Sequence, residues 1–117
     1  MADPPHTSPE FVNWLAGRHP GLVPVLDEHL ADNDELLPHV LFGDVTRYAL
    51  ALARDGEVDE LNRLLGDLDA ALGESDDEVA NLVWVSFVEN ASTDADEPLR
   101  TELRAFPHLA RALSHYE

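Results

Sequence analysis

Apolar residues recur at alternating steps of three and four between positions 57 and 72, and this spacing constrains the fold more than any other feature. A period near 3.6 places such residues on one stripe of an α-helix, whereas a half-buried β-strand would alternate apolar and polar residues. Acidic and polar side chains fill many of the remaining positions, so the sequence predicts an amphipathic helix with one wet face. The stripe consists of Val58, Leu61, Leu65, Leu68 and Leu72, widened by Leu64.

The beginning of the chain carries the signals of a helix start. Residues 1–7 are expected to form a disordered lead, and Ser8-Pro9-Glu10 supplies an N-cap serine, a first-turn proline and a first-turn acid. Gly17 is expected to close this first helix, and His19-Pro20 to open a second. We therefore expect one folded domain over residues 8–117.

Proline and glycine also mark the later helices. Gly43 interrupts the helical region 36–54 and leaves two alternatives open, either one kinked helix or two pieces, with Asp44 placed to cap the second. Pro107 is expected to break or kink the last helical region because it lacks a backbone donor and clashes with the preceding turn.

The most apolar segment is expected to form the central helix, at about 76–91. Ser75 and Glu78 fit a capping box, and the residues that follow are apolar around most of a helical circumference. The β-branched content of this segment would suit a strand, but its length and its helical neighbours favour a helix. Together the segments predict an all-α fold, a compact bundle of about five or six short helices with one central, largely buried helix.

Acidic residues dominate the charge of the chain. Twenty-four Asp and Glu oppose seven basic residues, all of them arginine, which gives a formal charge of −17. Such a surface repels nucleic acid phosphate and anionic lipid and attracts cationic proteins at long range. Direct binding of DNA or RNA, or of an anionic membrane, is therefore excluded as a function, and the charge indicates a basic protein partner. Adaptation to high salt, or solubility alone, is the alternative explanation.

The remaining composition favours a cytoplasmic protein. Cysteine is absent, so the chain has neither disulfides nor thiolate metal ligands. No basic segment followed by an apolar stretch opens the sequence, so we expect no cleaved signal peptide. The longest apolar run, residues 48–53, is too short to cross a bilayer.

Few residues suggest catalysis or metal binding. His29, Asp32 and His39 are ligand types, but the sequence has no HExxH motif and no repeated Glu-x-x-His pair, so we expect no metal and no other cofactor. Ser86 lies within the apolar segment, where we expect it to bond a backbone carbonyl. Without a Gly-x-Ser-x-Gly motif or a phosphate-binding loop, the sequence predicts a protein that is not an enzyme.

Polar residues inside the expected central helix suggest an internal network. Glu89 lies near its end, on the same half as Asn81 and Ser86, and Arg47 on the facing helix could pair with it. A role of these residues in partner binding, or emergence of Glu89 into solvent, is the alternative.

The acidic connections are the expected binding surface. Alternate connections of an up-and-down bundle lie at the same end, which groups the acids into two sets of seven. We assign partner binding to the first set, while acids that merely complement helix dipoles remain the alternative. The first set is Asp32, Asp34, Glu35, Glu74, Asp76, Asp77 and Glu78. The second is Asp55, Glu57, Asp59, Glu60, Asp94, Asp96 and Glu97.

Three segments resemble a known group of proteins. Residues 38–44 (PHVLFGD), residues 77–90 (DEVANLVWVSFVEN) and the region from Phe11 to Leu15 are similar to a family of small, uncharacterised helical proteins from bacteria. Members of this family are associated with polymorphic toxin systems as candidate immunity proteins. The resemblance covers most of the chain from residue 8 onward and implies a protein-binding role without catalytic residues. It leads to the hypothesis of an immunity-type protein that neutralises a basic, nuclease-like toxin by electrostatic occlusion. The alternative is a stand-alone structural or regulatory domain.

Overall fold

Helices form all the regular structure of the part of the chain that can be described. The computed structural model describes residues 7–74, 77–89 and 97–115, without the side chains of residues 74, 77, 97 and 98. These ranges contain no strand, and the all-α prediction is confirmed. The elements are α1 (Ser8–Arg18), the 3₁₀ turn η1 (Pro20–Leu22), α2 (Val23–Asn33), α3 (Pro38–Asp55), α4 (Val58–Glu74), α5 (Asp77–Val83), the π-helix η2 (Trp84–Val88), α7 (Glu97–Leu103) and α8 (Pro107–Ser114).

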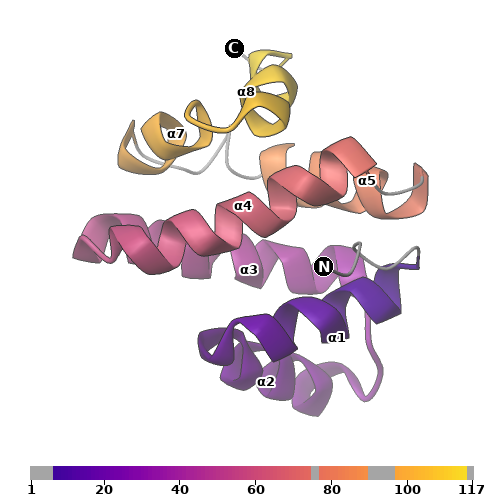
Figure 1. Ribbon diagram of the computed structural model, residues 1–117. Coiled ribbons are helices and arrows are strands. Elements are labelled where there is room, and N and C mark those ends of the chain that lie inside the picture. The colour runs from indigo at the N-terminus through magenta and orange to yellow at the C-terminus, as the bar shows by residue number, and fades with distance from the viewer. Residues whose placement is uncertain (1–6, 75–76, 90–96, 116–117) are drawn as a thin grey trace.

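The two longest helices, α3 and α4, form the middle of the molecule. They run in opposite directions from the tight turn at Gly56, whose φ of 76° suits a residue without a side chain (Figure 1). Helices α1 and α2 cover one side of this pair, and α7 and α8 cover the other (Figure 1). The α5–η2 segment contacts α1, α3, α4 and α8, which confirms the expected central helix.

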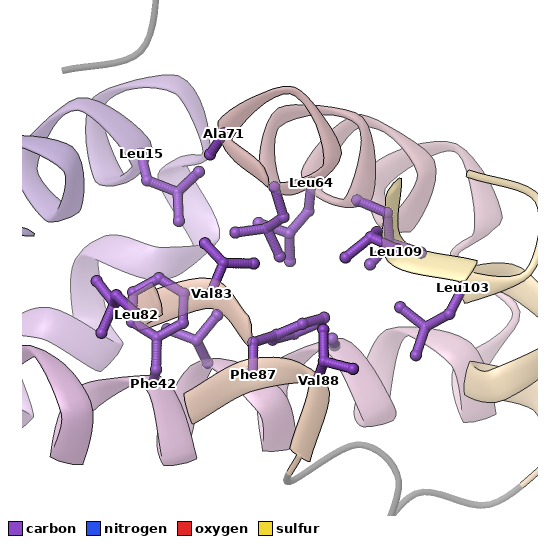
Figure 2. Close-up of a cluster of buried hydrophobic side chains, with 14 of the residues drawn as sticks. Leu15, Phe42, Leu64, Ala71, Leu82, Val83, Phe87, Val88, Leu103 and Leu109 are labelled. Carbon is purple, nitrogen blue, oxygen red and sulfur yellow. The ribbon is translucent and has the colours of Figure 1, made fainter. Parts of the chain in front are cut away.

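The core is a single cluster of aliphatic and aromatic side chains from all the helices that surround α5. Phe87 of η2 and Phe42 of α3 are fully buried, and Figure 2 shows them pointing into the same cluster as Leu64 of α4. Leu109 of α8 joins this cluster from the opposite side (Figure 2). Burial of such side chains is worth about 1.5–3 kcal/mol each, so this cluster holds the helices together.

The central helix differs from a regular α-helix in its second half. Residues Trp84–Val88 form a π-helical segment, in which one extra residue enters a turn. Asn81, Val85 and Glu89 are spaced four residues apart and are all exposed, so one face of this helix meets solvent. The expectation of burial around most of the circumference therefore fails on this face, whereas Val79, Leu82, Val83, Phe87 and Val88 are fully buried.

The first helix begins one residue earlier than its serine suggested. Thr7, not Ser8, is the N-cap residue, and its hydroxyl accepts the backbone N–H of Glu10 at 3.4 Å. Ser8 is instead the first helical residue and is buried. Of the expected disordered lead, residues 1–6 lie outside the described residues, and Thr7 belongs to the helix cap.

Two questions about helix continuity are answered by the structure. The region around Gly43 is one helix, α3, and Asp44 does not cap a restart. The last region is broken before Pro107, where Phe106 adopts an extended conformation and separates α7 from α8. Because of this break, the described residues contain seven α-helices instead of five or six.

Candidate functional site

Several acidic side chains are occupied within the fold and so contribute less to any external surface. Asp67 on α4 bonds the end of α1: its Oδ2 lies 2.8 Å from Arg18 Nε and 2.6 Å from His19 Nε2. The pKa of Arg18 is raised by its hydrogen bond and its charge interaction with Asp67. His19 is buried at this junction, so Asp67 fixes how α1 meets α4.

Two further acids cap helices to which they do not belong. The carboxylate of Glu78 accepts the backbone N–H of Ser8 at 2.5 Å, at the N-terminus of α1. Asp69 Oδ1 accepts the N–H groups of His108 and Leu109 at 2.8 and 2.9 Å, at the N-terminus of α8. Free N–H groups and the positive end of the helix dipole favour a carboxylate at these positions. Glu78, expected to bind a partner, therefore also stabilises the fold.

The acids of α2 and of the connection behind it have no such internal role. Their side chains are exposed and form no hydrogen bond or ion pair with any described residue. The sequence has no arginine between Arg18 and Arg47, so no cation of the same segment neutralises them. We call these residues the acidic α2 surface: Asp27, Glu28, Asp32, Asp34 and Glu35.

Local structure holds this surface in place. α2 ends at Asn33, and the C-cap residue Asp34 has a φ of 62°, the left-handed conformation that Asp tolerates. His29 is buried, and its Nε2 accepts the backbone N–H of Leu37 at 2.9 Å, which ties α2 to the beginning of α3. The connection that carries Asp34 and Glu35 is therefore anchored at both ends.

Two exposed aliphatic side chains accompany the acids on α2. Val23 is 43% exposed and Leu30 is 38% exposed. They are seven residues apart, two helical turns, and Asp27 lies between them on the same side of the helix. Apolar side chains with a polar, charged surround are the ordinary composition of a protein interface.

A groove runs between α2 and α3, and two acids of the acidic α2 surface, Glu28 and Asp32, line it. Its volume is about 410 Å³. Tyr48 donates a hydrogen bond from its hydroxyl to Glu60 Oε1 at 2.7 Å, and Arg47 pairs with Asp44. Burial, then the hydrogen bond and the charge of Glu60, raise the pKa of Tyr48 to about 12, so the phenol stays neutral. The lining residues are Val25, Glu28, Asp32, Asp44, Arg47 and Tyr48.

Comparison with known proteins identifies the family. A family model described as a domain of unknown function, DUF7674, matches residues 12–114. The chain belongs to the DUF7674 family. No curated protein and no solved structure matches the chain significantly. The family description names no activity and no partner.

In this DUF7674 domain, the residues predicted to bind a partner differ in their structural roles. Asp32, Asp34 and Glu35 are exposed on the acidic α2 surface, whereas Glu78 caps α1. The connection behind α2 and the beginning of α5 lie toward the same end of the bundle (Figure 1). The side chains of Glu74, Asp76 and Asp77 lie outside the described residues.

The second acidic set of the DUF7674 domain is only partly described. Asp55, Glu57 and Asp59 are exposed near the turn between α3 and α4, and Glu60 accepts the hydroxyl of Tyr48. The side chains of Asp94, Asp96 and Glu97 lie outside the described residues. This end therefore serves as an internal comparison for the acidic α2 surface.

Of the four residues proposed for an internal network around Glu89, only Ser86 is buried. Asn81 and Glu89 are exposed on the solvent face of the central helix, and Arg47 is exposed and pairs with Asp44 in its own helix. Ser86 is buried, and its Oγ lies 2.5 Å from His39 Nδ1. The sequence pattern had suggested a bond to a backbone carbonyl and did not indicate this histidine. The π-helical turn changes the side of the helix on which the residues after Val83 lie. A sequence pattern that assumes 3.6 residues per turn does not predict this change.

The histidine and serine positions favour structural roles. His29 and His39 are held by Leu37 and Ser86, and the described residues contain no group of three or more His, Asp or Glu arranged to hold a metal ion. The Ser86–His39 contact resembles a nucleophile and its base, but Ser86 is only 6% exposed. Within the described residues, no helix combines the length and the apolar character needed to cross a membrane.

Proposed function

We propose that this DUF7674 domain is a protein-binding module that binds a cationic protein through the acidic α2 surface. One observation carries the proposal: five exposed carboxylates gather on one helix and the connection behind it, with no ion pair to any described residue. Acids needed only for helix dipoles would lie in first helical turns, but none of these five lies in the first turn of α2, and three of them, Asp32, Asp34 and Glu35, lie in its last turn or beyond. Val23 and Leu30 add apolar contact area to the same helix.

The proposed mechanism combines electrostatic steering with occlusion. The formal charge of −17 attracts a cationic surface before contact, and steering of this kind raises association rates roughly 10- to 1000-fold at low salt. Once bound, the α2 surface covers cationic residues that would otherwise contact phosphate groups. The domain needs no catalytic residue and no cofactor for this task.

The sign of the charge and the family resemblance support a finer proposal. A toxin that cleaves nucleic acid needs a basic surface for its substrate, and an acidic partner can cover that surface. We therefore propose an immunity-type role in the bacterial cytoplasm, with a basic, nuclease-like toxin domain as the partner. The toxin of a neighbouring gene is the first candidate to test.

The decisive experiment measures association with that toxin domain at rising ionic strength. The triple variant Asp32→Asn/Asp34→Asn/Glu35→Gln should associate roughly tenfold more slowly at low salt, and this difference should shrink as salt screens the charges. The matched triple variant Asp55→Asn/Glu57→Gln/Asp59→Asn removes the same charge at the other end and should leave the rate nearly unchanged. Equal effects of both variants, or a rate indifferent to salt, would contradict the proposal.

A stand-alone structural or regulatory domain, whose charge serves solubility or high-salt adaptation, is the second candidate. The internal roles of Asp67, Asp69 and Glu78 favour it, because these acids are explained without a partner. Thermal unfolding at low and at molar salt separates the candidates. A binding module remains folded at low salt, whereas a domain adapted to high salt unfolds there and shows no partner-dependent stabilisation.

A further inference from the structure

The groove between α2 and α3 has walls of two chemical kinds. Val25 and the half-buried Tyr48 supply apolar and aromatic surface, and Glu28 and Asp32 supply two carboxylates one helical turn apart. Residues four apart lie on the same side of a helix, so both acids face the same groove. An elongated side chain with an apolar stem and a cationic, planar end would match both kinds of wall.

Tyr48 is held in a fixed position in this wall. Its hydroxyl donates a hydrogen bond to Glu60 on α4, a residue that does not line the groove. This bond fixes the orientation of the phenol ring. Gly21 packs closely against the same hydroxyl and against Cζ, where any larger residue would collide at 2.8 Å or less. The aromatic surface is therefore prepared before any partner arrives.

An arginine of the chain itself, Arg47, already lines the groove. Arg47 pairs with Asp44, the third acid of the groove, which leaves Glu28 and Asp32 without a cation among the described residues. Arg47 is 73% exposed, so this pair is weak and easily rearranged. The groove as a whole keeps a charge of −2, from three acids and one arginine.

We propose that the groove binds an arginine side chain of the cationic partner. This inference rests on the proposed function and names the contact by which the partner is recognised. A guanidinium presents five N–H donors in a flat fork and stacks on aromatic rings, whereas the ammonium of lysine is a compact, strongly hydrated charge. A divalent metal ion is the poorer occupant, because the described residues do not converge three ligands on one point.

The test titrates the ¹⁵N-labelled full chain with two probes, N-acetyl-arginine methylamide and N-acetyl-lysine methylamide. The arginine probe should bind in the millimolar range, at least about threefold tighter than the lysine probe, and shift the amides of α2 and of α3 near Tyr48. Equal binding of the two probes, or shifts spread over all acidic segments, would overturn the inference.

Matched variants locate the site. Glu28→Gln and Asp32→Asn should each weaken the arginine probe roughly two- to fivefold, while Glu57→Gln and Asp55→Asn should not. Arg47→Ala should strengthen it, because it frees Asp44, while Arg63→Ala makes the same change in net charge on an exposed part of α4 and should have no effect. No difference between the groove variants and their controls would refute the site.

A separate outcome distinguishes this inference from the proposed function. If the cationic partner still needs the acidic α2 surface but the groove variants treat the arginine and lysine probes alike, the groove inference fails and the protein-binding role stands. If the groove selects arginine but no cationic protein requires the α2 acids, the proposed function fails.

Discussion

The carboxylate of Glu78, in the first turn of α5, accepts the backbone N–H of Ser8 in the first turn of α1, seventy residues earlier in the chain. This contact joins two helix N-termini and gives a structural role to an acid that the sequence placed in a binding surface. Charge-assisted bonds of this kind are short and strong, because a carboxylate meets unpaired N–H groups and the positive end of a helix.

The Glu78–Ser8 contact predicts a specific dependence of stability on pH. The backbone N–H of Ser8, and then its hydroxyl, lower the pKa of Glu78 below its ordinary value of 4.5. The folded state therefore binds fewer protons than the unfolded state near that pH. The stabilisation is complete well above pH 4.5 and is lost as the pH falls through the lowered value. Urea unfolding should show Glu78→Gln as less stable than wild type at neutral pH, with the difference vanishing in acid, whereas Glu35→Gln should show no such convergence.

The cap that Asp69 provides for α8 should be measurable as stability. Asp69→Ala removes the acceptor of two backbone N–H groups at the start of a helix without a side-chain cap of its own, and should cost about 1–2 kcal/mol of unfolding free energy. Asp69→Asn keeps an oxygen acceptor and should cost less. Asp59→Ala, at an exposed position in the first turn of the same helix, removes only a favourable interaction with the helix dipole and should cost less in the same urea titration. A loss at Asp59 equal to that at Asp69 would contradict the assignment.

Tyr48 should ionise only at strongly alkaline pH. Its pKa is raised to about 12 by burial first and by Glu60 second. In the variant Tyr116→Phe, which leaves one tyrosine, ultraviolet absorbance should follow Tyr48 alone, and Glu60→Gln should lower the measured pKa toward 10. The neutral phenol stabilises the fold fully below pH 10, and this contribution is lost as the pH rises from about 10 to about 12. Ionisation at the ordinary value in the intact chain would refute the Tyr48–Glu60 contact.

Gly21 should tolerate no side chain while Tyr48 occupies its place. A Cβ at Gly21 would collide with the hydroxyl of Tyr48 and lie 2.8 Å from its Cζ. Gly21→Ala should therefore cost about 1–3 kcal/mol and displace the phenol from Glu60. In a double-mutant cycle, Tyr48→Phe removes the nearest atom, so the double variant should be more stable than the sum of the single losses by about 0.5 kcal/mol or more. Simple additivity would show that the two residues do not meet.

The spacing of apolar residues was sufficient to predict the helices, because a helix depends on interactions between residues only three or four positions apart. The stripe from Val58 to Leu72 gave a correct helix, although α4 continues through Gly73 to Glu74. The N-cap was misplaced by one residue because Thr7 and Ser8 both suit it, and the choice depends on Glu78, which is distant in sequence.

Sequence patterns could not assign the acids to their tasks. Asp67 and Asp69 differ by two positions on one helix, yet one binds the end of α1 and the other caps α8. Asp32 lies on an equally acidic helix and has no described partner. Which task a carboxylate has depends on which helix end packs within about 3 Å of it.

The sequence by itself therefore determined the helices, the apolar interior and the sign of the surface charge, because periodicity and composition act locally or on average. Only the tertiary structure decided which acids form bonds within the fold and which stay exposed without a described partner. The same packing created the α2–α3 groove and turned Ser86 toward His39. The physical reason is that a hydrogen bond depends on a few tenths of an ångström between helices, a relation that no single segment contains.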